Sequence, residues 1–257
     1  MIALRSSSEI ERLAEAGAIA DECMHMVLDL VRAGISTWEL DQKAESFIRK
    51  HGGIPTFKGY GEGANRFPAT LCTSINDEIV HGIPSKKRIL KAGDILKVDL
   101  GVTYHGYVAD MARTVAVGEI SPDAQLLIDR TRECFEKALE VMVPGMRLGD
   151  IGAAVQNHAE SFGYGVVREL TGHGVGEEMH EDPEVPNYGT AGRGLRLREG
   201  MVLAVEPMIN MGSRYVRFMP DGWAVTTRDG SLSAHYENTV AITAQGPRIL
   251  TTMGEAQ

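Results

Sequence analysis

Cysteine is scarce in this sequence. Cys23, Cys72 and Cys134 are odd in number and far apart, and no C-x-x-C motif occurs. This pattern excludes a disulfide framework and argues against a thiolate zinc site, so we expect a reducing, cytoplasmic compartment. Long apolar runs are also missing, because no uncharged stretch approaches the roughly 20 residues that span a bilayer. Glu9 and Glu11 interrupt the N-terminal region early, which excludes a signal peptide.

Clusters of positive charge are missing too. The formal net charge is −9 and Lys and Arg form no run, which disfavours a nucleic-acid partner or an anionic membrane surface. The remaining composition is that of a globular protein, with 43% hydrophobic and 24% charged residues, enough for a large core. We expect a single domain over residues 1–257, built from two similar halves at roughly 1–120 and 121–257.

Hydrophobic periodicity predicts two helices followed by strands in each half. In the first half one helix ends before Gly34, and a second begins at Ser36 and ends before Gly52. The second half repeats this order with helices over 121–143 and 148–162. Strands are predicted near 71–75, 95–101, 107–109, 112–117, 166–170, 201–211, 215–217, 223–227 and 237–244.

The repetition extends to individual residues. The segment R-I-L-K-A-G-D-I-L-K-V-D resembles L-R-L-R-E-G-M-V-L-A-V-E in the second half, and their glycines align Asp99 with Glu206. H-G-I-P stands opposite H-E-D-P in the same order, which pairs His81 with His180. Two halves related by a pseudo-twofold axis would bring the matched residues to one centre.

Four carboxylates and one histidine stand out as candidate metal ligands. Glu206 lies in the apolar run M-V-L-A-V-E-P-M-I, where a carboxylate is costly to bury unless it is paired or metal-bound. Asp110 and Glu237 follow near the end of each half, and glycines flank His173 so that a ligand can approach closely. Taken singly, an exposed strand end or a buried ion pair would explain each carboxylate, Asp99 included.

Taken together, these groups form an oxygen-rich shell with a single nitrogen, which suits Mn, Fe(II), Co or Zn. Four negative charges could not converge without cations, and two divalent ions would balance them. Such a pair can hold a bridging hydroxide, so we expect a dinuclear hydrolytic site. The other histidines lack this context and are expected to be solvated or structural: His25, His51, His105, His158 and His235.

Over nearly its whole length the chain resembles the type I methionine aminopeptidases of peptidase family M24. The resemblance rests on S-I-N-D-E-I-V-H-G-I-P, D-L-G-V-x-x-x-G-Y-x-A-D, T-G-H-G-V-G-x-x-x-H-E-D-P and V-E-P-M, all in order. It implies an α+β "pita-bread" fold, in which a curved antiparallel sheet holds the metals and helices cover its outer face. It also implies one catalytic domain that removes the first methionine by attack of a metal-bridging hydroxide on the first peptide bond.

The resemblance assigns roles to individual residues. Glu206 would bind metal and carry the proton from the attacking water toward the leaving nitrogen. His180 would stabilise the oxyanion, and His81 would contact the scissile amide or the next residue. Asp110 and Glu237 would bridge the two ions. The full set of implied metal ligands is Asp99, Asp110, His173, Glu206 and Glu237.

A side-chain pocket follows from the same resemblance, with a mixture of aromatic and soft groups that suits a thioether. Met179 replaces the aromatic residue usual before the second histidine, the loop at 61–66 is longer than usual, and Asn238 replaces a histidine. These departures affect the shape of the pocket or the surroundings of the metals. The implied pocket residues are Tyr60, Phe67, Cys72, Met179 and Trp223.

Two other interpretations remain open at this point. A prolidase or an aminopeptidase acting before proline shares the scaffold, but those chains usually add an N-terminal domain. A non-catalytic peptide-binding relative would be expected to lose metal ligands, and this sequence keeps all of them. The implied partner is the N-terminal peptide of nascent polypeptides near the ribosome, and the expected form is a cytoplasmic monomer without nucleic-acid or membrane partners.

Overall fold

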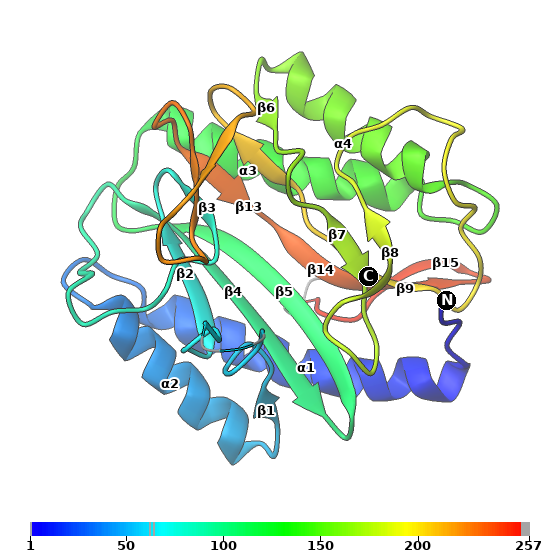
Figure 1. Ribbon diagram of the computed structural model, residues 1–257, viewed down its shortest axis with the longest axis horizontal. Helices are drawn as coiled ribbons and strands as arrows, with labels where there is room; N and C mark the ends of the chain where they lie inside the picture. The colour runs from blue at the N-terminus through cyan, green and yellow to red at the C-terminus, as the bar shows by residue number, and fades with distance from the viewer. Residues whose placement is uncertain (1, 62, 64, 253–257) are drawn as a thin grey trace.

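A curved antiparallel sheet occupies the middle of the protein, and long helices lie along its outer face (Figure 1). The computed structural model describes residues 2–61, 63 and 65–252. Within that part of the chain the helices are α1 (Ser7–Leu30), α2 (Thr37–Lys50), α3 (Pro122–Glu140) and α4 (Leu148–Ser161). This architecture confirms the predicted α+β pita-bread fold.

The helices begin where their capping residues place them. Ser6 and Ser36 each accept a hydrogen bond from the backbone of a glutamate three residues later, Glu9 or Glu39. That glutamate bonds back to the serine N–H, which completes a capping box and satisfies two free donors of the first turn. The second helix therefore starts where the sequence predicted it.

The main sheet runs in the order β1-β4-β5-β14-β9-β7-β8, with β2 paired to β4 and β15 paired to β14. Every pairing in it is antiparallel. Its strands are β1 (Ile54–Pro55), β2 (Leu71–Ile75), β4 (Ile95–Tyr104), β5 (Tyr107–Ala116), β7 (Gly172–Gly174), β8 (Glu181–Val185), β9 (Val202–Val205), β14 (Glu237–Thr243) and β15 (Gly246–Ile249).

Two small antiparallel sheets flank this one, in the orders β13-β10-β6 and β11-β12-β3. Both lie on the side of the main sheet away from α1 and α2 (Figure 1). Their strands are β3 (Glu78–Val80), β6 (Gly165–Val166), β10 (Met208–Asn210), β11 (Val216–Phe218), β12 (Val225–Thr227) and β13 (Ser233–His235).

Strands β5 and β14 join the first half of the chain to the second. Glu237 pairs with Ala112, and Asn238 pairs with Met111. Next along β14, the Thr239 side chain also bonds to β5. Its hydroxyl accepts a hydrogen bond from the Asp110 N–H and donates one to the Asp110 carbonyl, both at 2.9 Å. Each half also has its own apolar core, one between α1, α2 and β4, the other between α3, α4 and β9.

Several predicted strand boundaries were wrong. The strands placed at 107–109 and 112–117 are one strand, β5, because Asp110 lies inside the ladder and does not end it. The strand placed at 201–211 is interrupted at Glu206 and Pro207, since proline has no N–H to donate. Of the strand placed at 166–170, only Val166 lies in a strand, the two-residue β6 that begins at Gly165. Among the described residues, no helix combines the length and apolar character needed to cross a membrane.

Candidate metal centre and active site

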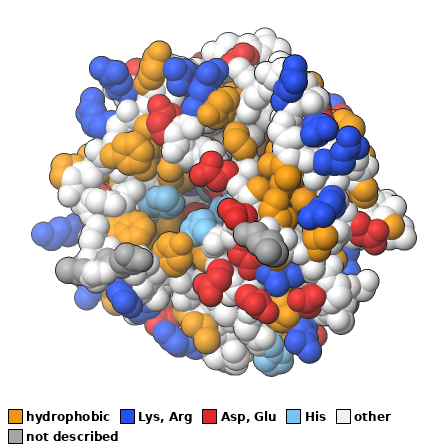
Figure 2. Space-filling model, turned by 45° about the vertical axis from the view of Figure 1, so that its right-hand side comes forward, with side chains coloured by type: hydrophobic (Ala, Val, Ile, Leu, Met, Phe, Trp, Pro, Cys, Tyr) orange, Lys and Arg blue, Asp and Glu red, His pale blue; other side chains and the backbone are white. Residues whose placement is uncertain are grey.

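One cavity of about 100 Å³ lies on the concave side of the main sheet. In the space-filling view, histidine and acidic side chains lie at the bottom of a hollow with hydrophobic side chains around it (Figure 2). All the site residues singled out from the sequence line the cavity, together with one that was not: Phe57, Tyr60, Phe67, Cys72, His81, Asp99, Asp110, His173, Met179, His180, Glu206, Trp223 and Glu237.

The four carboxylates lie symmetrically about the junction of the two halves. Asp110 on β5 and Glu237 at the start of β14 lie on the two strands that meet there. Asp99 on β4 and Glu206 directly after β9 lie one strand further out on each side. The alignment of Asp99 with Glu206 in the sequence thus corresponds to equivalent places in the sheet.

These carboxylates are buried, and no cation is at hand to neutralise them among the described side chains that line the cavity. Asp110 and Glu237 are each 2% exposed and Asp99 is 7% exposed. Burial, followed by repulsion between the carboxylates, raises the pKa of Asp99, Asp110, Glu206 and Glu237 well above the ordinary range. Full ionisation of the cluster requires added positive charge.

Several oxygens of the cluster also lack a hydrogen-bond partner among the described residues. They are Asp99 Oδ1, Asp110 Oδ1 and Glu237 Oε1. Buried polar atoms are normally satisfied, so unsatisfied oxygens that converge on one point are the pattern of a metal site. The ligand atoms form two groups that share Glu237, one with Asp110 and His173, the other with Asp99 and His235, each within 4.8 Å.

His173 presents a lone pair to the first of these groups. Its Nδ1 lies 2.9 Å from the Gly174 carbonyl oxygen, which can only accept, so Nδ1 carries the proton. The free Nε2 lies 3.8 Å from Asp110 Oδ2 and 3.7 Å from Glu206 Oε1. A backbone bond that fixes the tautomer in this way is typical of metal-binding histidines.

The glycines beside His173 serve the sheet, whereas the sequence suggested that they admit a ligand. A Cβ on Gly172 would lie 2.3 Å from the Ala204 carbonyl oxygen, and one on Gly174 would lie 2.3 Å from the Asp182 carbonyl oxygen. Both contacts are too close for any side chain. Glycine here allows β7 to lie tightly between its neighbours, which fixes the position of His173.

His235 is a site residue that the sequence analysis missed. We expected it to be solvated or structural, but its side chain is 1% exposed and reaches the carboxylate cluster. Its Nε2 lies 3.5 Å from Glu206 Oε2 and 3.7 Å from Glu237 Oε2. The signal was available in A-H-Y-E, because residues two apart in an extended chain point to the same side.

His81 and His180 line the same cavity as the four carboxylates. His81 has a positive φ of 59°, and a Cβ on the following Gly82 would lie 2.4 Å from the Thr73 carbonyl oxygen. The loop is therefore held tightly against β2. Burial, and then the proximity of His180, lowers the pKa of His81 to about 4. Nδ1 of His180 lies 2.5 Å from the Tyr60 hydroxyl oxygen.

The apolar part of the cavity is formed by aromatic rings and Met179. Phe67 lies edge-on to both Phe57 and Trp223, at centroid distances of 6.4 and 5.2 Å. Phe57 was missed by the sequence analysis because it lies in an irregular, Gly-rich segment without periodicity. Of the longer loop predicted at 61–66, Glu62 and Ala64 lie outside the described residues.

Asn238 faces away from the carboxylates. Its Oδ1 accepts from Arg113 Nη2 at 2.9 Å and from the Thr251 hydroxyl at 3.0 Å. Arg113 also donates to the Glu237 carbonyl oxygen at 2.7 Å. The residue that replaces the usual histidine is therefore linked through Arg113 to the backbone of Glu237.

Comparison with known proteins agrees with this geometry. The model of the family described as metallopeptidase family M24 matches residues 11–244. A methionine aminopeptidase of Clostridium acetobutylicum is 54% identical over 251 residues, which cover 98% of this chain and 99% of the relative. The crystal structure of methionine aminopeptidase from Rickettsia prowazekii superposes with a TM-score of 0.94 at 41% identity, covering 98% and 100% of the two chains.

Prolidases share the fold more distantly. The prolidase of Pyrococcus horikoshii superposes with a TM-score of 0.75 at 26% identity, and 96% of this chain covers only 63% of that one. The higher identity and full mutual coverage lie with the methionine aminopeptidases. The chain therefore belongs to metallopeptidase family M24, among the type I methionine aminopeptidases.

Proposed function

We propose that this protein is a metal-dependent hydrolase that removes the N-terminal methionine from peptides and nascent proteins by means of a pair of divalent cations. The observation that carries the proposal is the cluster of four buried carboxylates with raised pKa values, which two such cations would neutralise. Family membership and the shared cavity support the same activity.

The residues present fit a pair of metal ions. Glu237 belongs to both groups of ligand atoms, which supports a bridging role, and Asp110 would bridge beside it. Carboxylate oxygens with an imidazole nitrogen suit Co, Mn, Fe(II) or Zn. The unsatisfied oxygens of the cluster are the atoms that such ions would engage. The proposed ligands are Asp99, Asp110, His173, Glu206 and Glu237.

Bound ions of this kind lower the pKa of a shared water and supply a nucleophile near neutral pH. Glu206 is the proposed proton carrier, which accepts a proton as the first peptide bond is attacked and gives it to the leaving nitrogen. Its side chain is only 12% exposed but lines the cavity, so it reaches the substrate while bulk water is held back.

His180 is the proposed donor to the carbonyl oxygen of the first residue. We propose that the Tyr60 hydroxyl donates its hydrogen bond to Nδ1, which places the single proton of neutral His180 on Nε2. Burial lowers the pKa of His180, so the ring is neutral at pH 7 and keeps this single proton. His81, which lines the same cavity, is proposed to contact the scissile amide or the next residue.

The apolar side of the cavity is proposed to bind the methionine side chain. Phe67, Trp223 and the thioether of Met179 provide a polarisable surface that suits another thioether. Tyr60 and Cys72 also line the cavity and are proposed to belong to the same side-chain pocket.

We further propose a single catalytic domain that works as a cytoplasmic monomer on chains emerging from the ribosome. The β5–β14 pairing, which joins the halves into one sheet, supports a single domain. Three cysteines that are all free and buried suit a reducing compartment. A net charge of −9 favours contact with the peptide over contact with ribosomal RNA.

A peptide panel tests the activity. Metal-stripped protein is assayed on a Met-Gly peptide, its N-acetylated form, a Leu-Gly peptide and an Ala-Pro peptide, with Co, Mn, Fe(II) or Zn added back singly. We expect release of methionine from the first peptide alone, and only after an ion is added. Preference for the Ala-Pro peptide, or full activity without metal, would overturn the proposal.

A further inference from the structure

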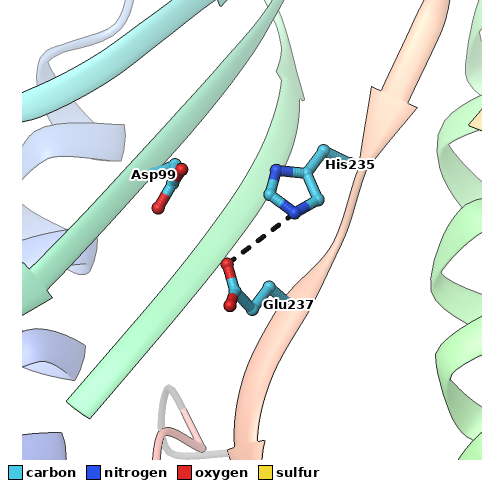
Figure 3. Close-up of side chains that lie close together, drawn as sticks. All are labelled: Asp99, His235 and Glu237. Carbon is cyan, nitrogen blue, oxygen red and sulfur yellow. Dashed lines mark ion pairs between the residues drawn. The ribbon is translucent and has the colours of Figure 1, made fainter. Parts of the chain in front are cut away.

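The imidazole of His235 is buried beside the carboxylates and has no hydrogen-bond partner in the described part of the chain. Both ring nitrogens are unsatisfied, although the side chain is 1% exposed. Orphaned nitrogens at this depth are rare in folded proteins, and coordination of an ion is one of the ordinary reasons for them. His235 comes from β13, whereas Asp99 and Glu237 come from β4 and β14, and the three side chains converge (Figure 3).

The distances match those between ligands of one ion. Donors that each lie about 2.0–2.3 Å from an ion are about 3.0–4.2 Å from one another. Nε2 of His235 lies 3.5 Å from Glu206 Oε2 and 3.7 Å from Glu237 Oε2, at the limit of a hydrogen bond or beyond it. The separations around His173 are of the same size, at 3.7 and 3.8 Å.

The two imidazoles lie on either side of Glu206. Oε1 of Glu206 faces His173, and Oε2 faces His235. One ligand group contains His173 with Asp110 and Glu237, and the other contains His235 with Asp99 and Glu237. Each ion position defined by these groups therefore has its own nitrogen.

Two hydrogen bonds hold the backbone of His235, and its ring points toward Glu237 (Figure 3). The Thr114 hydroxyl accepts from its N–H at 2.9 Å and donates to its carbonyl at 2.8 Å. Two residues earlier, the buried Lys97 Nζ donates to the Ser233 carbonyl at 2.9 Å. Ligand positions that are held by such supporting contacts are typical of metal sites.

We propose that His235 is a sixth protein ligand, which gives a nitrogen to the ion held by Asp99 and Glu237. The inference rests on the two-ion site proposed above and adds a ligand to it. An imidazole at the second position raises its affinity for Co, Fe(II) and Zn relative to Mn, which prefers oxygen. The pair of ions is then nitrogen-ligated at both positions.

The test measures how many ions bind, with what affinity, and how many imidazoles coordinate them. It does not depend on catalytic activity. Metal-stripped wild type and the variants His235→Gln and His235→Ala are titrated with Co(II) by calorimetry. Co X-ray absorption of the loaded proteins then gives the number of imidazoles per ion. His25→Gln, on the exposed side of α1, is the matched control, and circular dichroism verifies the fold of each variant. Glutamine at 235 keeps a hydrogen-bond donor of similar length without the imidazole nitrogen.

We expect wild type and His25→Gln to bind two ions with about one imidazole per ion. In both His235 variants the weaker ion should lose more than about 100-fold in affinity, since even outer partners of a metal are worth about 10–100-fold. The tighter ion should keep its affinity and its imidazole. If His235→Gln bound both ions with wild-type affinity and imidazole count, His235 would not be a ligand, although the two-ion site would stand. A wild type that bound no ion would overturn the site itself.

Discussion

The Tyr60 hydroxyl lies 2.5 Å from Nδ1 of His180, which joins the loop after β1 to the loop before β8. Tyr60 is 40% exposed, so the bond contributes little to stability, but in the proposed arrangement Tyr60 donates to Nδ1 and keeps the proton of His180 on Nε2. We predict that Tyr60→Phe lowers kcat about 10-fold and leaves metal affinity unchanged, because oxyanion stabilisation depends on that proton. Steady-state kinetics and calorimetry on the same protein measure both quantities.

His180 itself should matter more. We predict that His180→Ala lowers kcat by about 10²–10³-fold, the usual cost of an oxyanion donor, while both ions remain bound. Metal content by emission spectroscopy is the control. Loss of metal in proportion to activity would make His180 a ligand and not an oxyanion donor.

Glu206 allows a sharper test of the proton carrier. Glu206→Gln keeps the shape of the side chain but cannot accept a proton. We predict that kcat falls by at least about 10²–10⁴-fold, the usual contribution of general acid–base catalysis. A Met-Gly peptide should still bind, as measured by protection of the protein in a thermal unfolding scan. Near-normal turnover by this variant would show that another group carries the proton.

Phe57 takes the space that a side chain at Gly101 would need. A Cβ on Gly101 would lie 2.9 Å from Phe57 Cε1 and 3.3 Å from Met179 Sδ. We predict that Gly101→Ala raises KM for methionine peptides several-fold, because the ring must move into the cavity. The double variant Phe57→Ala with Gly101→Ala should recover part of the loss. Phe57→Ala alone should accept first residues that are larger than methionine.

Asp229 gives a pH-dependent prediction away from the metal centre. It accepts from the Ser231 hydroxyl at 2.7 Å and the Ser213 N–H at 2.7 Å, and these bonds hold its pKa below the usual range. A lowered carboxylate pKa stabilises the fold above the unfolded value near 4, and the gain disappears as pH falls below it.

We therefore predict that Asp229→Asn lowers Tm by about 2–4 °C at pH 7, a small change because the residue is exposed. The difference from wild type should shrink as pH falls from 5 to about 2. Thermal unfolding followed by circular dichroism at a series of pH values measures it. A difference that stayed constant with pH would mean that the charge of Asp229 plays no part.

The carboxylates of the site could be identified in the sequence because burial of charge is costly. Glu206 stands out within a continuous apolar run, and its alignment with Asp99 follows from the repeated glycines. Asp110 was harder to identify, because its neighbours in the sequence are equally compatible with an exposed carboxylate at a strand end. In the structure Asp110 is only 2% exposed. Asp110 is buried because β5 pairs with β14 from the other half of the chain. Such long-range strand pairing cannot be read from the local sequence.

The residues that were missed depend mainly on long-range contacts, since A-H-Y-E places His235 on the same side as Glu237 but does not bring the pair to the carboxylate cluster. His235 becomes a site residue only because Thr114 and Lys97, from β5 and β4, hold its strand against the cluster. Phe57 lines the cavity only because Gly101, forty-four residues later, leaves room for its ring. Both cases require the tertiary structure, whereas helix starts at Ser36 and Ser121 follow from capping within a single turn.

The junction of β5 with β14 has a consequence for biosynthesis. Asp110 lies in the first half of the chain and Glu237 in the second, so the cluster of buried carboxylates is complete only when both halves have been synthesised and have docked. Neither half alone holds the four carboxylates, so a chain extended only through β5 has Asp99 and Asp110 without Glu206 and Glu237.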